Sequence, residues 1–393
     1  MALPLPHWRA LFRRRPRPQE ASYCDAPAEY TGGNRCTLLT DGKQAYPAML
    51  EAIAGACRSV HLESYILQSD KTGWEFARAM AERAHAGVAV RVIFDAVGSL
   101  DLSADYVQYL RNNGVQSLEY HPVAPWRPRW AWGRRDHRKI LIVDGHIGFT
   151  GGLNIGDEYA DPSRGGGGWR DTAVRIEGPA AYELDHLFRA VWFRETGRWF
   201  GLAGHPEHAG GDSLVRVSAN HEFFHRHRIR KAYVHALRQA RKTVTIANAY
   251  YVPDRVTRRA IYGAARRGVS VRILVQGESD VPAVAWAGRN LFDEHLRHGV
   301  RLFVWPGPVL HAKAVTIDGM WSSVGSYNMD HLSWLKNLEV NLLMLDDRLT
   351  RELEDQFDKD LARSQEVDLA GWRLRPWQDK LLERAFYLAR YWL

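Results

Sequence analysis

The sequence predicts an α/β protein made of two tandem halves of the same design, and two observations support this prediction. A short pattern, H-x-K-x4-D, occurs at residues 137–144 and again at residues 311–318. The segments that precede the pattern are also repeated, in the same order. The repeat has the size of a domain, so it indicates a duplicated half and not an array of short repeats.

The repeated segments define the elements of each half in order. Residues 59–65 resemble 243–250 as a first strand, and residues 87–94 match 268–275 as a second strand. Residues 110–115 match 296–300, where a helix ends before a third strand. Strands that alternate with helices are typical of helical layers on a largely parallel sheet.

We expect the chain to divide into four parts. The two halves are expected at residues 37–205 and 213–365, joined by a stretch rich in Gly and His at residues 201–211. A basic, aromatic segment at residues 1–36 precedes them, and an amphipathic segment at residues 366–393 follows them. A chain of 393 residues is long enough for two such cores.

Each copy of the pattern predicts a buried strand that runs into a hairpin. Mostly apolar and β-branched residues stand between its Lys and its Asp, and Gly follows the Asp in both copies. Side chains two positions apart lie on one face of a strand. His137 is therefore expected beside Lys139, and His311 beside Lys313.

A turn of small residues, G-[GS]-x-N, follows each copy and ends at Asn154 and Asn328. Two halves that face each other bring two His, two Lys and two Asn around one point. This set suits a phosphodiester: one imidazole attacks phosphorus, the other protonates the leaving alkoxide, and Lys and Asn hold the non-bridging oxygens. The alternative of two solvated hairpins is disfavoured because the same context occurs twice.

The composition is that of a folded protein with a basic surplus. Hydrophobic residues make up 46% and charged residues 25%, with a formal charge of +8. The three cysteines have neither metal-ligand spacing nor the pattern of a disulfide framework, which favours a reducing compartment. No apolar run predicts a transmembrane helix, and the N-terminus lacks the apolar core of a signal peptide.

Three segments mix Arg with aromatic residues, at residues 7–15, 125–135 and 377–393. This composition is typical of segments that lie at a bilayer interface beside anionic lipid, and nucleic acid is the alternative partner. For residues 377–393, whose apolar side chains have helical spacing, the alternative is a helix docked on the core. The second segment, with Trp126, Trp130 and Trp132, stands directly before His137.

The duplicated pattern resembles the phospholipase D superfamily from about residue 36 to residue 365, and its flanking segments resemble bacterial cardiolipin synthases. Those segments are residues 63–65, 154–159, 169–172, 174–179, 250–254, 328–330 and 337–339. Subtypes with two N-terminal membrane helices do not match, and the shorter B-type form fits better. One departure is His331, where the family commonly has Arg; we interpret it as a tolerated change in the outer part of the site.

The resemblance implies two phospholipase D-like α/β/α sandwich halves with a pseudo-two-fold active site between them. It implies a transient phosphatidyl-histidine, commonly on the first-copy histidine, with the other histidine as general acid and then general base. Two phosphatidylglycerol molecules would give cardiolipin and glycerol. The predicted site comprises catalytic His137, Lys139, Asp144, His311, Lys313 and Asp318, phosphate-binding Asn154 and Asn328, and supporting Glu158 and Glu339.

No cofactor or metal is expected, because Lys139 and Lys313 supply the charge that Mg²⁺ supplies elsewhere. Asp144 and Asp318 are expected to orient neighbours, or to pair with a His or Lys of the opposite element. The symmetry of the two copies leaves open which His is the nucleophile.

The expected partners are phosphatidylglycerol and a membrane surface, without nucleic acid. The expected location is peripheral, on the cytoplasmic side of a bacterial inner membrane. The alternatives are hydrolysis of phospholipid by a phospholipase D-type phosphodiesterase, a nuclease, and a lipid-binding protein without activity. Nucleases of this superfamily are commonly dimers with one motif per chain, and two intact motifs disfavour a protein without activity. The acceptor stays open between phosphatidylglycerol, phosphatidylethanolamine and a simple polyol.

Overall fold

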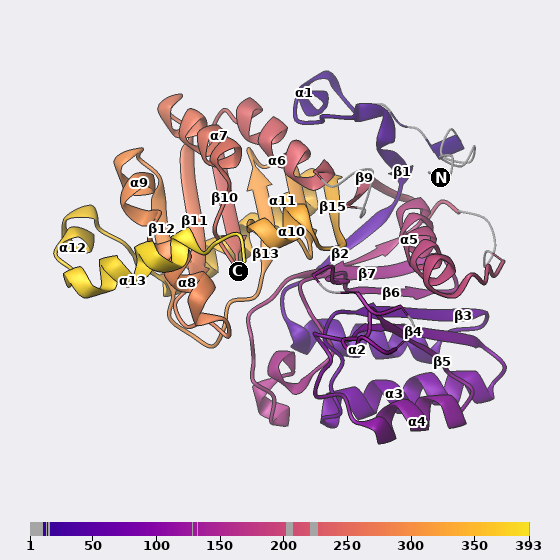
Figure 1. Ribbon diagram of the computed structural model, residues 1–393. Coiled ribbons are helices and arrows are strands. Elements are labelled where there is room, and N and C mark those ends of the chain that lie inside the picture. Colours follow the sequence, from indigo (N-terminus) through magenta and orange to yellow (C-terminus); the bar gives the residue numbers. More distant parts are fainter. Residues whose placement is uncertain are drawn as a thin grey trace.

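The protein has two lobes, and each lobe is built around one twisted sheet with helices on both faces (Figure 1). The computed structural model describes residues 11–12, 14, 16–127, 129–131, 133–201, 207–220 and 227–392. Trp132, Leu393 and most of the segment 7–15, all named above as membrane-facing, lie outside the described residues.

The first half contains a seven-stranded sheet with the strand order β2-β8-β7-β6-β3-β4-β5. Its strands are β2 (Arg35–Leu39), β3 (Ser59–Ser64), β4 (Ala89–Asp95), β5 (Gln116–Tyr120), β6 (Ile140–Val143), β7 (Ile147–Gly151) and β8 (Ala173–Glu177). Its helices are α2 (Gly42–Ala54), α3 (Lys71–His85), α4 (Ala104–Asn112) and α5 (Pro179–Thr196).

The second half contains a nine-stranded sheet with the order β1-β9-β15-β14-β13-β10-β11-β12-β16. Its strands are β1 (Thr31–Gly33), β9 (Gly211–Asn220), β10 (Thr243–Asn248), β11 (Ser270–Gln276), β12 (Arg301–Trp305), β13 (Lys313–Ile317), β14 (Trp321–Gly325), β15 (Glu339–Leu345) and β16 (Gln365–Glu366). Its helices are α6 (Arg228–Gln239), α7 (Arg255–Arg266), α8 (Pro282–Arg289), α9 (Phe292–Arg297), α10 (His331–Leu335) and α11 (Asp347–Arg363).

The two sheets have the same core topology, because β9-β15-β14-β13-β10-β11-β12 repeats the order of the first sheet. The motif hairpins are β6–β7 and β13–β14, joined by the predicted Asp-Gly turns. Both residues of each turn have positive φ, as a tight hairpin turn requires: Asp144 (53°), Gly145 (77°), Asp318 (56°) and Gly319 (66°). The predicted order of elements in each half is confirmed.

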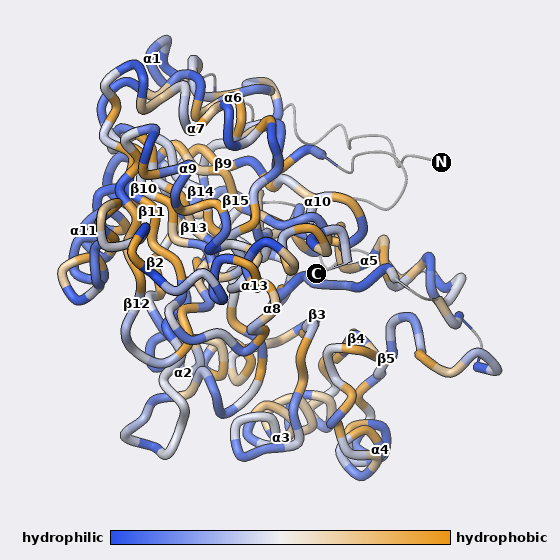
Figure 2. The backbone as a smooth tube through the Cα atoms, turned by 60° about the vertical axis from the view of Figure 1, so that its left-hand side comes forward, coloured by the Kyte–Doolittle hydropathy of each residue, from blue (hydrophilic) through white to orange (hydrophobic). Residues whose placement is uncertain are grey.

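Among the described residues, the three large hydrophobic clusters define five layers. Helices α5 and α11 lie between the two sheets and share one core with both. Helices α2, α3 and α4 cover the outer face of the first sheet, and α6, α7 and α9 cover the outer face of the second. In Figure 2 the central strands of the second sheet, β10 to β13, are largely hydrophobic. Each half is therefore an α/β/α sandwich, and the predicted fold class is confirmed.

The expectation of a largely parallel sheet is wrong. Parallel pairing is confined to β3-β4-β5 and β10-β11-β12, the strands that helices connect. The motif hairpins and the strands beyond them pair antiparallel. The physical reason is the connection: a tight turn returns the chain antiparallel, whereas parallel neighbours need a crossover long enough for a helix.

Both terminal segments pack on the second half. Helix α1 (Pro18–Ala21) precedes β1, which pairs with β9, and Tyr30 lies in the outer core of the second half. At the other end, α12 (Leu369–Arg373) and α13 (Trp377–Leu388) run along α9 and α8. No helix within the described residues is long and apolar enough to span a bilayer.

Candidate active site

The two motifs meet because each is bridged to the other half. The backbone N–H of His137 donates to the carbonyl of Leu338 at 3.1 Å, and Leu338 N–H donates to Arg135 at 3.0 Å. In the equivalent place, His311 N–H donates to the carbonyl of Arg170 at 2.7 Å. These reciprocal bridges hold both motifs at the boundary between the halves, as the pseudo-two-fold arrangement predicts.

Each histidine is held by a carboxylate from the opposite half. His137 Nδ1 lies 3.0 and 3.1 Å from the two carboxylate oxygens of Glu339, at the start of β15. His311 Nδ1 lies 2.7 Å from Asp171, just before β8. Strand register makes Asp171 and Glu339 equivalent, so the two halves exchange the same side chain. A carboxyl group that accepts from Nδ1–H leaves the lone pair of Nε2 free to face a substrate.

The two motif lysines are buried next to the histidines. The ammonium groups of Lys139 and Lys313 donate to the backbone carbonyls of His137 and His311 respectively, the first at 2.7 Å. Burial lowers the pKa of Lys139 to about 7 and the pKa of Lys313 to about 8. A bound phosphate would restore both charges, because a nearby anion favours the charged form.

Two tyrosines complete the walls of the site. The Tyr65 ring meets the His137 ring edge-on at 4.9 Å and lies 5.0 Å from the Lys139 ammonium. The Tyr250 ring is 6.1 Å from the His311 ring and 5.8 Å from the Lys313 ammonium. These rings exclude water from the flanks of the charged groups and strengthen their field.

The charges around the two histidines are not the same. Burial lowers the pKa of His137 well below its ordinary value, and the cations Lys139 and Lys313 lower it further. Burial and the Lys313 cation also lower the pKa of His311, but there the Asp171 carboxylate opposes the effect. Burial raises the pKa of Glu339 to about 8. Both histidines are thus driven toward the neutral form, and the difference between them is that the Asp171 carboxylate favours the protonated form of His311.

The two turn asparagines have different surroundings. Asn154 donates to the Tyr159 hydroxyl at 2.7 Å, and that hydroxyl lies 3.4 Å from His311 Nδ1. Asn328 is buried, and its Oδ1 has no hydrogen-bond partner among the described residues. Asn154 is therefore linked to His311 through Tyr159, whereas Asn328 keeps a buried acceptor free.

Asp144 and Asp318 lie away from the histidines, at the far end of the motif strands. The Asp144 carboxylate accepts from the N–H groups of residues 57, 58 and 59 at 2.6–2.9 Å. The Asp318 carboxylate accepts from the N–H groups of residues 241, 242 and 243 at 2.7–2.8 Å, and from the Tyr23 hydroxyl at 2.7 Å. Each therefore ties the motif hairpin to the start of its neighbouring strand, which matches the expectation that they orient neighbours.

Of the two glutamates predicted to support the site, Glu158 and Glu339, one lies in the site and the other lies away from it. Glu339 is in the site, whereas Glu158 accepts from Gln68 Nε2 at 2.7 Å and, among the described residues, makes no hydrogen bond or ion pair with either histidine. Sequence reasoning did not assign Asp171 a role. A signal for it existed, because each half has a carboxylate where the strand after the Asn turn starts: Asp171 stands two residues before β8, and Glu339 is the first residue of β15.

Comparison with known proteins agrees with this geometry. Two facing sandwich halves that each bring a His and a Lys to one buried site define a protein of the phospholipase D class. A family model described as "Cardiolipin synthase, PLD-like domain" matches residues 49–192 and 233–361, more than half of the chain. The chain belongs to this family, as its sequence pattern predicted.

Individual relatives give the same result. The chain is 34% identical over 357 residues to "Cardiolipin synthase 2" of Bacillus anthracis, covering 89% of this chain and 69% of that protein. It is 35% identical over 350 residues to "Cardiolipin synthase" of Geobacillus sp. (strain WCH70), covering 88% and 70%. A crystal structure of phosphatidylserine synthase from Haemophilus influenzae Rd KW20 superimposes with a TM-score of 0.66 at 14% identity, covering 91% of this chain and 95% of that one. That likeness shows the fold.

Proposed function

We propose that the protein is a phosphatidyltransferase that makes cardiolipin and glycerol from two phosphatidylglycerol molecules. The observation that carries the proposal is the exchange of carboxylates, His137 with Glu339 and His311 with Asp171, around two buried lysines. The names of the curated relatives support the same reaction.

In the first step the Nε2 atom of His137 attacks phosphorus. An N–P bond forms while the bond from phosphorus to the glycerol oxygen breaks, and His311 gives its proton to the leaving oxygen. The lowered pKa of His137 suits a nucleophile, which must be neutral, and the Asp171 carboxylate beside His311 stabilises the protonated imidazole that an acid needs. The Lys139 and Lys313 ammonium groups balance the charge that develops on the non-bridging oxygens.

In the second step a hydroxyl of another phosphatidylglycerol replaces the histidine. His311 accepts the proton of that hydroxyl, the new O–P bond forms, and the N–P bond breaks. The enzyme returns to its starting state, with one cardiolipin and one glycerol as products. Glu339 and Asp171 keep each ring in one tautomer and orientation through both steps.

We further propose that the protein works at the surface of a bacterial inner membrane, on the cytoplasmic side, as a peripheral protein. Exposed Trp126 and Trp130 lie just before His137, and α13 exposes Trp377, Leu381 and Leu388. Helix α13 also packs part of its surface, through Phe386, beside α8. It therefore combines the docked helix and the exposed apolar surface that the sequence left as alternatives. We also propose the division of the chain into four parts, at residues 1–36, 37–205, 213–365 and 366–393.

The test is incubation with labelled phosphatidylglycerol vesicles, followed by separation and mass analysis of the lipids. Equal amounts of cardiolipin and glycerol are expected, with and without EDTA. Phosphatidic acid as the main lipid product would indicate hydrolysis instead. Added phosphatidylethanolamine tests the acceptor, because its transfer product has a different mass.

A further inference from the structure

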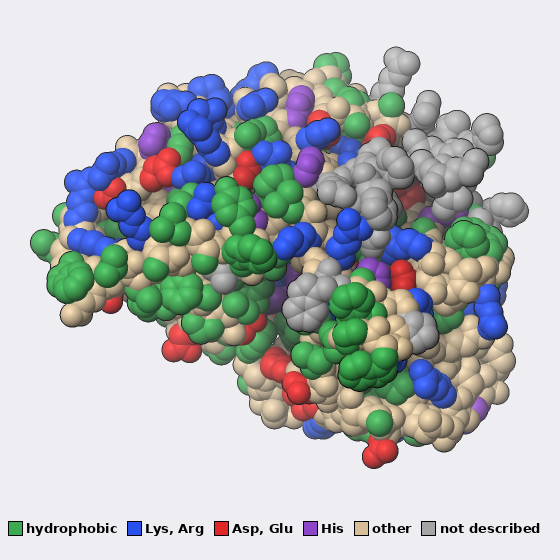
Figure 3. All heavy atoms as spheres, in the orientation of Figure 1, with side chains coloured by type: hydrophobic (Ala, Val, Ile, Leu, Met, Phe, Trp, Pro, Cys, Tyr) green, Lys and Arg blue, Asp and Glu red, His purple; other side chains and the backbone are tan. Residues whose placement is uncertain are grey.

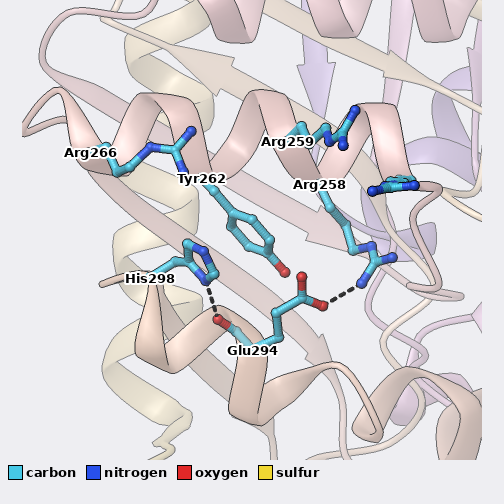
Figure 4. A pocket seen from close by; sticks show the side chains of 7 residues that line it. Arg258, Arg259, Tyr262, Arg266, Glu294 and His298 are labelled. Carbon is cyan, nitrogen blue, oxygen red and sulfur yellow. Dashed lines mark hydrogen bonds and ion pairs between the residues drawn. The ribbon is translucent and has the colours of Figure 1, made fainter.

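A cavity outside the active site is lined mainly by arginine. It lies between α7 and α9 on the outer layer of the second half, and its volume is about 240 Å³ (Figure 4). Helix α7 contributes Arg255, Arg258, Arg259 and Arg266, and Glu294 of α9 is the carboxylate in its lining. The catalytic histidines instead lie at the boundary between the halves.

Most of these cations have no anionic partner among the residues that the structure describes. Arg258 is paired with Glu294. Arg255, Arg259 and Arg266 are exposed, and among the described residues no hydrogen bond or ion pair is made by their guanidinium groups. Four like charges around one cavity repel each other, and one carboxylate offsets only one of them. An anion bound from outside would relieve the remainder.

The duplicated helix in the first half shows that the fold does not need these arginines. Helices α3 and α7 occupy the same place in the repeat, and both begin after an Asp that caps them, Asp70 and Asp254. Counted from those caps, Glu75 and Glu82 of α3 stand where α7 has Arg259 and Arg266. The charge is reversed at these two positions, whereas Lys71 keeps the charge of Arg255. Arg259 and Arg266 therefore point to a task other than folding.

The wall of the cavity is rigid before any ligand arrives. The Tyr262 ring stacks on the His298 ring at 4.0 Å, with 12° between the planes. The Tyr262 hydroxyl lies 3.2 Å from His295 Nδ1, and His295 Nε2 lies 2.7 Å from the Tyr251 hydroxyl. A preformed wall lowers the entropy lost on binding.

We propose that this cavity binds the phosphate group of an anionic phospholipid, as a second lipid site distinct from the catalytic one. Guanidinium groups match phosphate oxygens in geometry and charge. A lipid is favoured over free phosphate because an exposed apolar side chain lies in the neighbouring C-terminal segment. Arg373 of that segment contacts Asp293 of α9 at 2.9 Å, and the next residue, Leu374, is 86% exposed. Figure 3 shows Lys and Arg gathered over the upper part of the second half, with hydrophobic side chains along the region of α12 and α13. This choice of ligand rests on the proposed function.

The test compares two variants with the same change in net charge. R255Q/R259Q/R266Q removes the unpaired cations of the cavity. R351Q/K359Q/R363Q removes three exposed cations from α11, none of which has an ion pair among the described residues. Binding is measured by flotation with phosphatidylglycerol vesicles, with neutral phosphatidylcholine vesicles, and by titration with inorganic phosphate, all at one salt concentration.

The cavity variant is expected to bind phosphatidylglycerol vesicles about tenfold more weakly than the α11 variant, and to lose one phosphate site. Its turnover of a dispersed short-chain phosphatidylglycerol is expected to be that of the wild type. Equal vesicle binding by the two variants would overturn the proposal, whether or not inorganic phosphate binding is lost. Tighter binding to duplex DNA than to vesicles, lost in the cavity variant alone, would overturn the lipid assignment. Vesicle binding is measured independently of catalysis. A wild-type protein that binds vesicles but makes no cardiolipin would therefore refute the proposed function and leave the proposed binding site standing.

Discussion

The two halves share one strand order but differ in what lies behind each histidine. Behind His137 the first half buries three ionisable side chains, Glu63, Asp136 and Arg138. Ile140 and Ala314 each stand three residues after their motif histidine. Ile140 pairs in register with Glu63, and Ala314 pairs with Ala247, so Glu63 and Ala247 are equivalent positions. The equivalent positions in the second half hold Ala247, Leu310 and Ala312.

Arg138 links this cluster to the other half. Its guanidinium lies 3.7 Å from the Glu63 carboxylate and donates to the carbonyls of Asn220 at 3.2 Å and Glu339 at 3.4 Å. Arg138 therefore braces the residue that holds His137. A duplicated fold can keep one geometry and still give its two histidines different electrostatic surroundings, which is what a nucleophile and an acid require.

The strongest test of this difference replaces the histidines one at a time. H137A and H311A are each expected to lower kcat by at least about 10⁴-fold, because the two roles are not interchangeable. With labelled phosphatidylglycerol, H311A is expected to accumulate a covalent phosphatidyl-enzyme slowly, and H137A none. The measurement is labelled protein after denaturation, with circular dichroism as a control for folding. A labelled H137A and an unlabelled H311A would reverse the assignment of nucleophile and acid.

The exchanged carboxylates come next. E339Q and D171N are each expected to lower kcat by about 10²–10⁴-fold, because each imidazole loses its orientation and its Nδ1–H tautomer. Each change lies in the half opposite to the histidine that it affects. The matched control is E158Q, whose carboxylate bonds to Gln68 and whose activity is expected to stay close to that of the wild type. A loss in E158Q as large as in E339Q would contradict this division.

The pH dependence of kcat/KM should separate the two lysines. A lysine is charged below its pKa and loses its charge as the pH rises, so substrate binding weakens as the pH rises through about 7 for Lys139 and about 8 for Lys313. Because the pKa of His137 is lowered well below its ordinary value, the nucleophile is already neutral over the range in which the two lysines titrate. K139R, which keeps its charge, is expected to preserve kcat/KM to higher pH than K313R does. Identical profiles for both variants and the wild type would exclude the lysines as the titrating groups.

The smallest expected effect is on stability, and it should be alike in both halves. D144A and D318A each leave three backbone N–H groups without an acceptor, which costs about 1–3 kcal/mol of unfolding free energy. Urea denaturation measures the loss, and kcat per folded molecule is expected to be retained. A fall in kcat of catalytic size at unchanged stability would return these residues to the catalytic set that the family resemblance implies.

The duplication, the hairpins and the identity of the two His-Lys sets could be predicted from the sequence alone. These features are local: strand periodicity, an Asp-Gly turn and the spacing of His and Lys depend on residues a few positions apart. The predicted sheet direction was wrong, because the helical crossovers make their strands parallel but the hairpins that follow them pair antiparallel.

Only the tertiary structure decided which carboxylate serves which histidine. Asp171 and His311, or Glu339 and His137, are far apart in the chain and belong to opposite halves, so no local pattern links them. The same holds for the arginine cavity, where two helices of the second half place unpaired cations together. Strand periodicity shows which face of an element is buried, but the partner across that face is set by how whole layers pack, and here by how two copies of one fold face each other.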